Sequence, residues 1–365
     1  MADGPNEQQI ANASIFESGE RVYRLPEVLS AAGFRGDLEP LYQDLREGQA
    51  CHAYAEEEGF ALEMQELQAA SEDYRYARDL ITAEETEAWL QERHLTLDDF
   101  NDFLTREHWR RRFSTDLDRI LPEYSPLENL TASSLWAGMM LGDRFKALVI
   151  PLARRVAVMR EYAADPPAPQ LAEEVKKTFL GRIADSAPDL ESWLERNLCS
   201  RAWFEELSAL EAHFQKSRYS LLAPDRCLRE VHAHRIDLTR IDAEGFGFPS
   251  KEMAQESFLC MIQDGENPET VVQRAGGNTA RCSWLVKDLS EEGQQIFISA
   301  PPGEFLPPLE WDGAFWIFRV ARKIDPDLED PEVRPWIEEK VLDLSLNPLV
   351  DKHVRWLCPL TWVLG

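Results

Sequence analysis

Few side chains in this chain combine a reactive type with a useful spacing, and the most suggestive lie between residues 229 and 324. His232 and His234 alternate in the run REVHAHRIDL, which predicts a β-strand with both imidazoles on one face. A metal site needs at least a third ligand, and none follows at a suitable spacing. We therefore expect no metal ion at this pair.

Cys282, in the run ARCSWLVK, is a candidate nucleophile. A thiol needs a neighbouring base to become a reactive thiolate, and the sequence pattern places none beside it. The run alternates as a strand does, so a small thiol packed in a core is the competing interpretation. The chain has no phosphate-binding loop, dinucleotide fingerprint, serine-hydrolase elbow or zinc-protease motif, so we expect no cofactor.

The six cysteines, at 51, 199, 227, 260, 282 and 358, form no CxxC pair. This spacing favours free thiols in a reducing cytoplasm over a zinc knuckle or a redox motif. The first 20 residues lack the basic and apolar regions of a secretory signal. No run is apolar over roughly eighteen residues. We expect a cytoplasmic protein without a membrane-spanning segment.

The chain has 365 residues and a formal net charge of −27. This acidic excess disfavours binding to nucleic acid, whose phosphates need Lys and Arg, and to anionic membrane surfaces. A basic or neutral polypeptide fits better as a partner, although the charge could serve only to keep the protein soluble. The length and the apolar fraction of 44% allow two or three folded domains.

The elements that position these residues begin with a long helical region. Apolar residues recur at spacings of three and four over 21–163 and over 170–228, which predicts two helical units after a flexible tail at 1–20. Thr82 and Thr96 each precede an acidic first turn and are predicted N-caps. The prolines of ADPPAP, just before the second unit, predict a stiff connector.

Two helical segments repeat one pattern 104 residues apart. The runs EAWLQERHLTLDDF and ESWLERNLCSRAWF share a Trp-Leu pair and a Phe: Trp89, Leu90 and Phe100 in the first, Trp193, Leu194 and Phe204 in the second. We expect both motifs to pack the cores of similar helical units. Coincidence between two amphipathic segments is the alternative.

The pattern changes near residue 229. After the predicted strand REVHAHRIDL come a helix, a shorter helix, a strand, another short helix, and two strands joined at Asp312–Gly313. The first of these helices, SKEMAQESFLCMIQDG, has Ser250 as its predicted N-cap. A last helix, DPEVRPWIEEKVLDLSL, and an aromatic tail occupy 325–365.

This order of elements over 229–324 resembles peptidyl-prolyl isomerase domains of the parvulin type. The resemblance is carried by QDGENPETVVQRAG, by the glycine turn and strand of GGNTARCSW, and by PPGEFLPPLEWDGAFWIFRV. The helical region before this domain and the helix after it look like the architecture of SurA-type chaperones. The resemblance implies an α+β fold: a large all-α N-terminal region with two similar units, a parvulin-like α/β domain at 229–324, and a C-terminal helix and tail, 325–365, that return to the helical region.

The resemblance also implies where a peptide would bind. The two histidines of the family fall on Arg235 and Phe315, so the polar side of an isomerase site is incomplete. Leu289 and Phe297 fall on positions of the apolar pocket. The middle Asp or Cys of the family has no match here, and Cys282 lies later, in the strand. We expect these five residues to form a peptide-binding site with weak or no catalysis.

The predicted function is that of a cytoplasmic, chaperone-like protein that binds an unfolded or precursor peptide. Runs such as AEEEGFALEMQELQ resemble parvulin-related proteins of bacterial peptide-maturation and secretion systems, which implies a precursor peptide as the client. Two alternatives stay open. One is an active peptidyl-prolyl isomerase, and the other is a scaffold that recruits a peptide-modifying enzyme.

Overall fold

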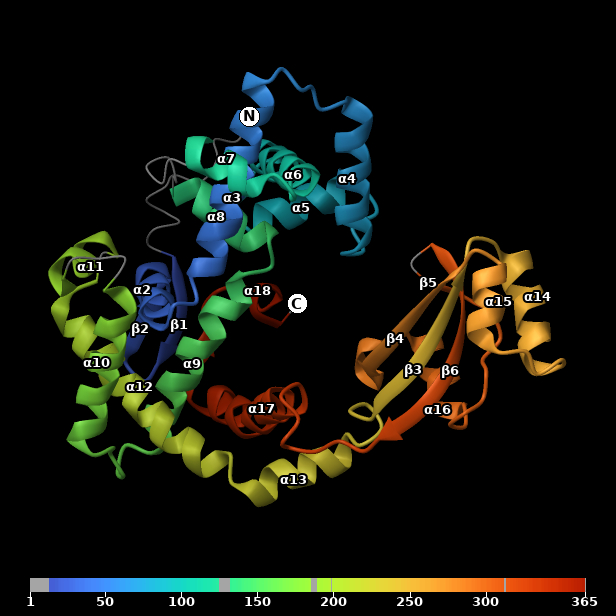
Figure 1. Cartoon of the computed structure of the whole chain (residues 1–365). Coiled ribbons are helices and arrows are strands. Elements are labelled where there is room, and N and C mark those ends of the chain that lie inside the picture. The colour runs from blue at the N-terminus through green and yellow to red at the C-terminus, as the bar shows by residue number, and fades with distance from the viewer. Residues whose placement is uncertain (1–12, 125–131, 185–188, 198, 312, 365) are drawn as a thin grey trace. The chain divides into compact units, whose positions relative to one another are not determined.

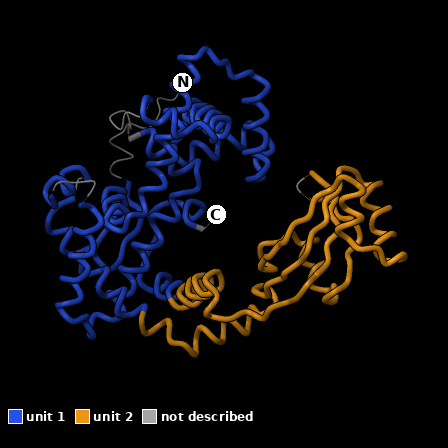
Figure 2. The backbone as a smooth tube through the Cα atoms, viewed as in Figure 1, with its two compact units in different colours: residues 1–218, 346–365 blue, residues 219–345 orange. Residues whose placement is uncertain are grey.

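The computed structural model describes residues 13–124, 132–184, 189–197, 199–311 and 313–364. The chain divides into two compact units: unit 1 comprises residues 1–218 and 346–365, and unit 2 comprises residues 219–345 (Figure 2). The described residues are mostly helical and form one antiparallel sheet in each unit (Figure 1). The expected α+β class is therefore found. Among the described helices there is no candidate for a bilayer-spanning segment.

Unit 1 combines many helices with a small sheet, which corrects the prediction of an all-α region. Its strands β1 (Ser14–Ser18), β2 (Arg21–Arg24) and β7 (Arg355–Trp356) form an antiparallel sheet in the order β2-β1-β7. Its helices are α2 (Leu25–Arg35), α3 (Glu39–Glu57), α4 (Met64–Tyr76), α5 (Ala83–Glu92), α6 (Leu97–Arg112), α7 (Leu117–Tyr124), α8 (Ala132–Leu141), α9 (Phe145–Glu161), α10 (Pro169–Ile183), α11 (Leu190–Arg196), α12 (Arg201–Leu221) and α18 (Thr361–Leu364). Helix α12 ends just beyond the boundary of unit 1.

Strand β1 corrects the expectation of a flexible tail over 1–20. Ile15 and Phe16 are fully buried, and Phe16 pairs with Trp356 of β7. The partner strand lies near the other end of the chain, so no local pattern indicates this pairing. The rest of the predicted tail, residues 1–12, lies outside the described residues.

Capping residues fix where several helices begin. Thr82 Oγ1 accepts a hydrogen bond of 3.1 Å from the amide of Glu85, and Thr96 Oγ1 accepts one of 3.1 Å from the amide of Asp99. The acidic side chain accepts from the backbone amide of the threonine in both cases, which completes a capping box. Both predicted N-caps are confirmed.

The repeated segments form two similar groups of helices, α4–α5–α6 and α10–α11–α12. Helix α6 begins at Leu97 and α12 begins at Arg201, which reproduces the 104-residue offset of the sequence. Both groups contribute to one main core, which also holds residues of α2, α8 and α9. The predicted units 21–163 and 170–228 are therefore not separate domains, because parts of both pack in unit 1.

The apolar residues that the two copies share are equally buried in both, except at the tryptophan. Four of them are buried in the main core: Leu90, Phe100, Leu194 and Phe204. Trp193 is also buried, with 5% of its surface exposed. Trp89 is only partly buried, and the guanidinium carbon of Arg93 lies 3.9 Å from the centre of its ring.

Unit 2 is built around a four-stranded sheet. Its elements are α13 (Pro224–Ala233), β3 (Arg240–Phe248), α14 (Lys251–Ile262), α15 (Pro268–Arg274), β4 (Asn278–Leu285), the 3₁₀ helix η2 (Val286–Asp288), α16 (Glu291–Ser299), β5 (Leu309–Trp311), β6 (Ala314–Ile324) and the first part of α17 (Val333–His353). The strands are antiparallel in the order β4-β3-β6-β5. The predicted sequence of elements is found from β3 onward. Ser250 caps α14 as predicted, whereas Asp312 of the predicted turn lies outside the described residues.

The first strand of the sheet lies later in the chain than the sequence predicts. The run REVHAHRIDL forms the end of α13 and the turn after it, so His232 and His234 do not alternate on a strand face. Pro224 begins this helix, a position where its missing amide costs nothing, and Cys227 and Val231 bury one side of it. The compact unit accordingly extends over 219–345 rather than 229–324.

The two faces of the sheet of unit 2 pack against different helices. Phe246 and Ile317 face a core completed by α14 and α15. Ile241 and Phe318 face a second core, which includes Phe297 of α16. Because side chains alternate along a strand, neighbouring residues of β3 and β6 belong to opposite faces.

Helix α17 corrects the prediction that all of 325–365 packs on the helical region. Val333, Ile337 and Val341 pack with residues of α13 inside unit 2. Only the segment from residue 346 onward belongs to unit 1, where Val350 and Val363 lie in the main core. The division arises because α17 carries apolar residues along its whole length, so each half can bury its own set.

Candidate functional site

The residues predicted to form one peptide-binding site are dispersed in unit 2. Leu289 and Phe297 are buried between the sheet and α16, and Cys282 packs partly buried against the same core. Phe315 lies on the opposite face, against the core beneath α14 and α15. The structure thus brings three of the five residues together and places Phe315 and Arg235 elsewhere.

Arg235 does not lie in a strand. This corrects the expectation that it stands at the position of the first-strand histidine of the parvulin family. It follows α13, its side chain is 63% exposed, and its Nη2 donates to both carboxylate oxygens of Asp325 at 2.9 and 3.0 Å. The sequence has no histidine between residues 240 and 324. Neither β3 nor β6 therefore carries an imidazole, whichever alignment relates them to the family.

Five aromatic side chains gather where one face of the sheet packs against α16, and we call this group the aromatic face. They are Trp284 of β4, Phe297 of α16, Trp311 of β5, and Trp316 and Phe318 of β6. Their contacting ring centroids lie 5.4 to 6.4 Å apart. Phe297 and Phe318 are buried, whereas the three indoles are partly exposed. The face therefore has a buried aromatic base and three indole rings that solvent reaches.

Two glycines of β3 let Trp316 lie close against the sheet. A Cβ atom at Gly245 would lie 3.1 Å from Trp316 Cε3, and one at Gly247 would lie 3.0 Å from Trp316 Cη2. Trp316 also lies parallel to Phe318, with ring centroids 6.0 Å apart and planes at 13°. A side chain at either glycine position would press on the indole, so the position of Trp316 depends on both glycines.

A hollow of about 390 Å³ lies beside Cys282, where the pairing of β3 with β6 shifts register after Asp242. Asp242 accepts hydrogen bonds of 2.7 Å from Ser283 Oγ and 2.6 Å from Arg322 Nε, and these contacts lower the pKa of its carboxyl. Burial raises the pKa of the Cys282 thiol. A protonated, partly buried thiol is a poor nucleophile, so the geometry favours a packing role for Cys282.

One cluster in the described part of the chain has the composition of a metal site. The ligand atoms of Cys260, Asp264 and Glu266 lie within 4.8 Å of one another. Arg274 Nη1 already lies 2.9 Å from a carboxylate oxygen of Glu266, so the cluster is partly neutralised by the protein itself. The cluster lies at the end of α14, away from the aromatic side chains of the opposite sheet face.

The indole rings of the aromatic face were missed in the sequence, although a signal for them exists. Cys282 and Trp284 are two residues apart in β4, and Trp316 and Phe318 are two residues apart in β6. Period-two spacing of this kind places both members of a pair on one face. The side chain of Trp316 therefore lies on the aromatic face, whereas that of its neighbour Phe315 lies on the opposite face.

Comparison with known proteins gave matches among solved structures only. No family model matches the chain, and no curated protein matches it. A peptidylprolyl isomerase (PrsA) of Bacillus anthracis matches at 12% identity over 56% of this chain and 94% of its own, with a TM-score of 0.27. The corresponding protein of Bacillus cereus matches at 10% identity over 61% of this chain and 86% of its own, with a TM-score of 0.34.

A further match is to one of two structurally related SurA-like chaperones of Campylobacter jejuni. It has 10% identity over 58% of this chain and 87% of the matched chain, with a TM-score of 0.20. These neighbours are peptidyl-prolyl isomerases and SurA-like chaperones by their own descriptions. At such identities and TM-scores the likeness establishes neither a common fold nor a common activity.

Proposed function

We propose that this protein binds non-native or precursor polypeptide through the aromatic face of unit 2, without efficient prolyl isomerisation. The observation that carries the proposal is the arrangement of Trp284, Trp311 and Trp316. Three partly exposed indoles stand together over a buried base of two phenylalanine rings. Partly exposed aromatic side chains with a rigid base are typical of surfaces that bind other polypeptides.

The strands that carry these indoles suit an extended client. Trp284 belongs to β4 and Trp311 belongs to β5, and these strands are the two edges of the sheet. An extended peptide can pair its main chain with such an edge while its alternate side chains pack on the sheet face. Apolar side chains of the client would bury area against the indoles at about 25 cal/mol for each Å² removed from water.

Catalysis of prolyl isomerisation is disfavoured by the chemistry of the same face. The strands that bound it carry no histidine. Trp316 covers the stretch of β3 at Gly245 and Gly247, and the indole ring offers only one hydrogen-bond donor. The thiol of Cys282 is partly buried with a raised pKa. The face is suited to holding a peptide rather than to polarising its amide bond.

The client that we propose is a basic or neutral precursor peptide handled in the cytoplasm. The net charge of −27 supports a client without strong negative charge. All six cysteines lie in described segments and are free thiols, which supports a reducing compartment.

The test compares two variants of full-length protein that differ in adjacent residues. Trp316→Ala removes an indole from the aromatic face, and Phe315→Ala removes a ring from the opposite face. Both are titrated calorimetrically with a permanently unfolded, reduced and alkylated polypeptide of positive net charge. We expect Trp316→Ala to weaken binding about tenfold or more, as for the loss of a central aromatic anchor. Phe315→Ala should bind as wild type does.

The opposite ranking of the two variants would place the peptide on the face of α14 and α15 and refute the proposal. An isomerisation assay with a proline-containing peptide runs in parallel. Acceleration well above the uncatalysed rate would establish the isomerase alternative instead. Circular dichroism of each variant controls for loss of folding.

A further inference from the structure

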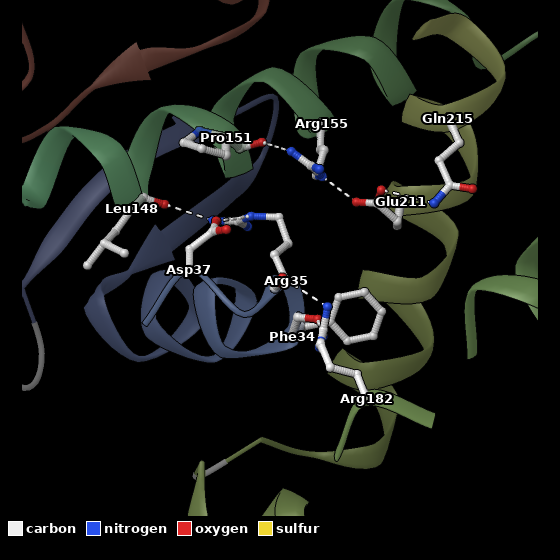
Figure 3. Close-up of polar contacts among 9 residues, drawn as sticks. All are labelled: Phe34, Arg35, Asp37, Leu148, Pro151, Arg155, Arg182, Glu211 and Gln215. Carbon is white, nitrogen blue, oxygen red and sulfur yellow. Dashed lines mark hydrogen bonds and ion pairs between the residues drawn. The ribbon is translucent and has the colours of Figure 1, made fainter. Parts of the chain in front are cut away.

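Unit 1 contains a cavity of about 400 Å³ that the proposed function does not use. It lies between α2 and the turn after it, α9, α10 and α12. Six charged side chains line it: Arg35, Asp37, Arg154, Arg155, Arg182 and Glu211. Figure 3 shows five of these converging from separate elements. Four guanidinium groups therefore meet two carboxylates, which gives this cavity a positive excess in a strongly acidic chain.

Arg35 is a deeply buried cation of this cavity. Its side chain is only 7% exposed. Nε donates a hydrogen bond of 2.6 Å to Asp37 Oδ2, and Nη2 donates one of 3.1 Å to the carbonyl oxygen of Leu148. Nη1 is buried and has no hydrogen-bond partner among the described residues. A charged donor left open in a buried site is unfavourable, so it indicates a missing acceptor.

The neighbouring groups do not supply that acceptor, because they are engaged elsewhere. Arg155 Nε donates a hydrogen bond of 2.5 Å to Glu211 Oε2, and Gln215 Nε2 donates one of 3.2 Å to the other oxygen of Glu211. Burial opposes ionisation of Glu211, but Arg155 beside it holds the pKa of that carboxyl below its usual value. Burial and the like charge of Arg155 also lower the pKa of Arg35 to about 10.

Arg182 adds a second cation at the end of α2. Its Nη1 donates a hydrogen bond of 2.9 Å to the carbonyl oxygen of Arg35, and its Nη2 donates to the carbonyl oxygen of Phe34. The guanidinium therefore stands where the last carbonyl groups of α2 need donors. Both of these acceptors are main-chain carbonyl oxygens rather than carboxylates (Figure 3).

We propose that this cavity binds an oxyanion, a carboxylate or a phosphate, carried on a small apolar body. The oxyanion accepts from Arg35 Nη1 and balances the excess positive charge. Planar guanidinium groups recognise carboxylate and phosphate oxygens through paired donors. Apolar side chains complete the walls: Phe34, Pro151, Val175, Phe179 and Phe214. A cavity of this size accommodates a ligand of about one aromatic ring with its charged group.

The experiment titrates the full-length protein with three probes of one shape. Benzoate supplies a carboxylate, phenyl phosphate supplies a phosphate, and benzyl alcohol supplies the ring without a charge. Calorimetry and the shift of the melting temperature report binding at constant ionic strength. We expect at least one anion to bind and to raise the melting temperature in a concentration-dependent way, and benzyl alcohol to do neither. The tighter anion identifies the ligand class.

Two substitutions in the cavity have opposite expected effects. Arg35→Gln removes the open donor and should weaken anion binding about tenfold or more. Glu211→Gln removes a competing negative charge and releases Arg155, so it should tighten binding roughly three- to tenfold. Arg229→Gln, the same chemical change on an exposed arginine of α13, is the matched control and should bind as wild type does.

Each outcome decides the proposal. Equal binding of benzyl alcohol and the anions would show an apolar cavity only, and would overturn it. Unchanged affinity in Arg35→Gln would place the anion elsewhere and overturn it too, as would the absence of binding by both anions. If Arg35→Gln fails to fold, Arg182→Gln is measured instead, and an unchanged affinity there overturns the proposal equally.

Discussion

The ring of Trp193 stands edge-on to the ring of Phe179, with centroids 4.8 Å apart and planes at 83°. Phe179 also contacts Phe204, so the three rings join α10, α11 and α12. The other copy of the repeat has the same arrangement around Tyr74, which meets Trp89 at 6.1 Å and Phe100 at 5.1 Å. An aromatic residue of the preceding helix thus holds the Trp-Leu motif in both copies.

The two tryptophans should differ in their contribution to stability. Trp193→Ala removes a buried ring and should cost about 3–5 kcal/mol of unfolding free energy. Trp89→Ala removes a partly exposed ring under Arg93, and we expect roughly 1–2 kcal/mol. Urea denaturation followed by far-ultraviolet circular dichroism measures both. Equal losses would show that partial exposure of Trp89 does not reduce its contribution.

Removal of residues 346–365 should destabilise unit 1 selectively. The truncation deletes strand β7, which pairs with β1, and takes Val350 and Val363 out of the main core. Hydrogen exchange should then speed up at the amides of β1 and α9. The amides of β3 and β6 serve as the internal control, because the cores on both faces of their sheet contain no residue beyond 345. Equal loss of protection in both units would contradict this expectation.

Acid should weaken the attachment of the end of α17 in unit 1. Lys352 Nζ donates to Glu161 Oε2 at 2.6 Å, and His353 Nε2 lies 2.6 Å from the same oxygen. These contacts lower the pKa of Glu161 from its usual 4.5. A lowered pKa means that the stabilisation is complete above pH 4.5 and is lost as the pH falls through the lowered value.

Glu161→Gln tests this pH dependence. The variant should melt at a lower temperature than wild type near neutral pH. The difference should shrink as the pH falls through the lowered pKa of Glu161 and vanish once the wild-type carboxyl is also protonated. A difference that stays constant over this range would exclude ionisation of Glu161 as its source. Melting curves at a series of pH values provide the measurement.

Two glycine substitutions should change stability in opposite directions. Gly181 lies in the last turn of α10 with nothing within 4 Å of an added Cβ, so Gly181→Ala should stabilise by about 0.5 kcal/mol. At Gly277 an added Cβ would lie 2.3 Å from the carbonyl oxygen of Gly247, a backbone atom. Gly277→Ala should therefore destabilise unit 2 by roughly 1–3 kcal/mol. Thermal unfolding of both variants distinguishes these outcomes.

Local signals predicted where several helices begin, because the causes of a helix start are local. Thr82, Thr96 and Ser250 cap helices that begin at the next residue, and each uses an amide three residues away. Strand β3 was missed for the opposite reason. Gly245 and Gly247 lower its strand propensity, and only pairing with β4 and β6 on its two sides stabilises it.

The two candidate sites could be predicted only in part. The two-residue spacing of Trp316 and Phe318 predicts that both lie on one face of the strand. The sequence does not show which face this is, because that depends on the packing of α16. The cavity offered no sequence signal, since Arg35, Arg155, Arg182 and Glu211 come from four different helices. An arginine in a helix usually lies in solvent, and only tertiary packing brings these four side chains to one space.

The pairing of β1 with β7 has a consequence for synthesis on the ribosome. Residues 14–18 are translated before unit 2, whereas their partner strand at 355–356 is made only after the whole of unit 2 has been translated. Unit 2 receives every residue of its sheet before unit 1 receives its last strand. The buried side chains of β1 therefore stay incompletely covered during translation, a period in which nascent chains are prone to misassembly. Translation of unit 1 thus starts before that of unit 2, and the sheet of unit 1 is completed after that of unit 2.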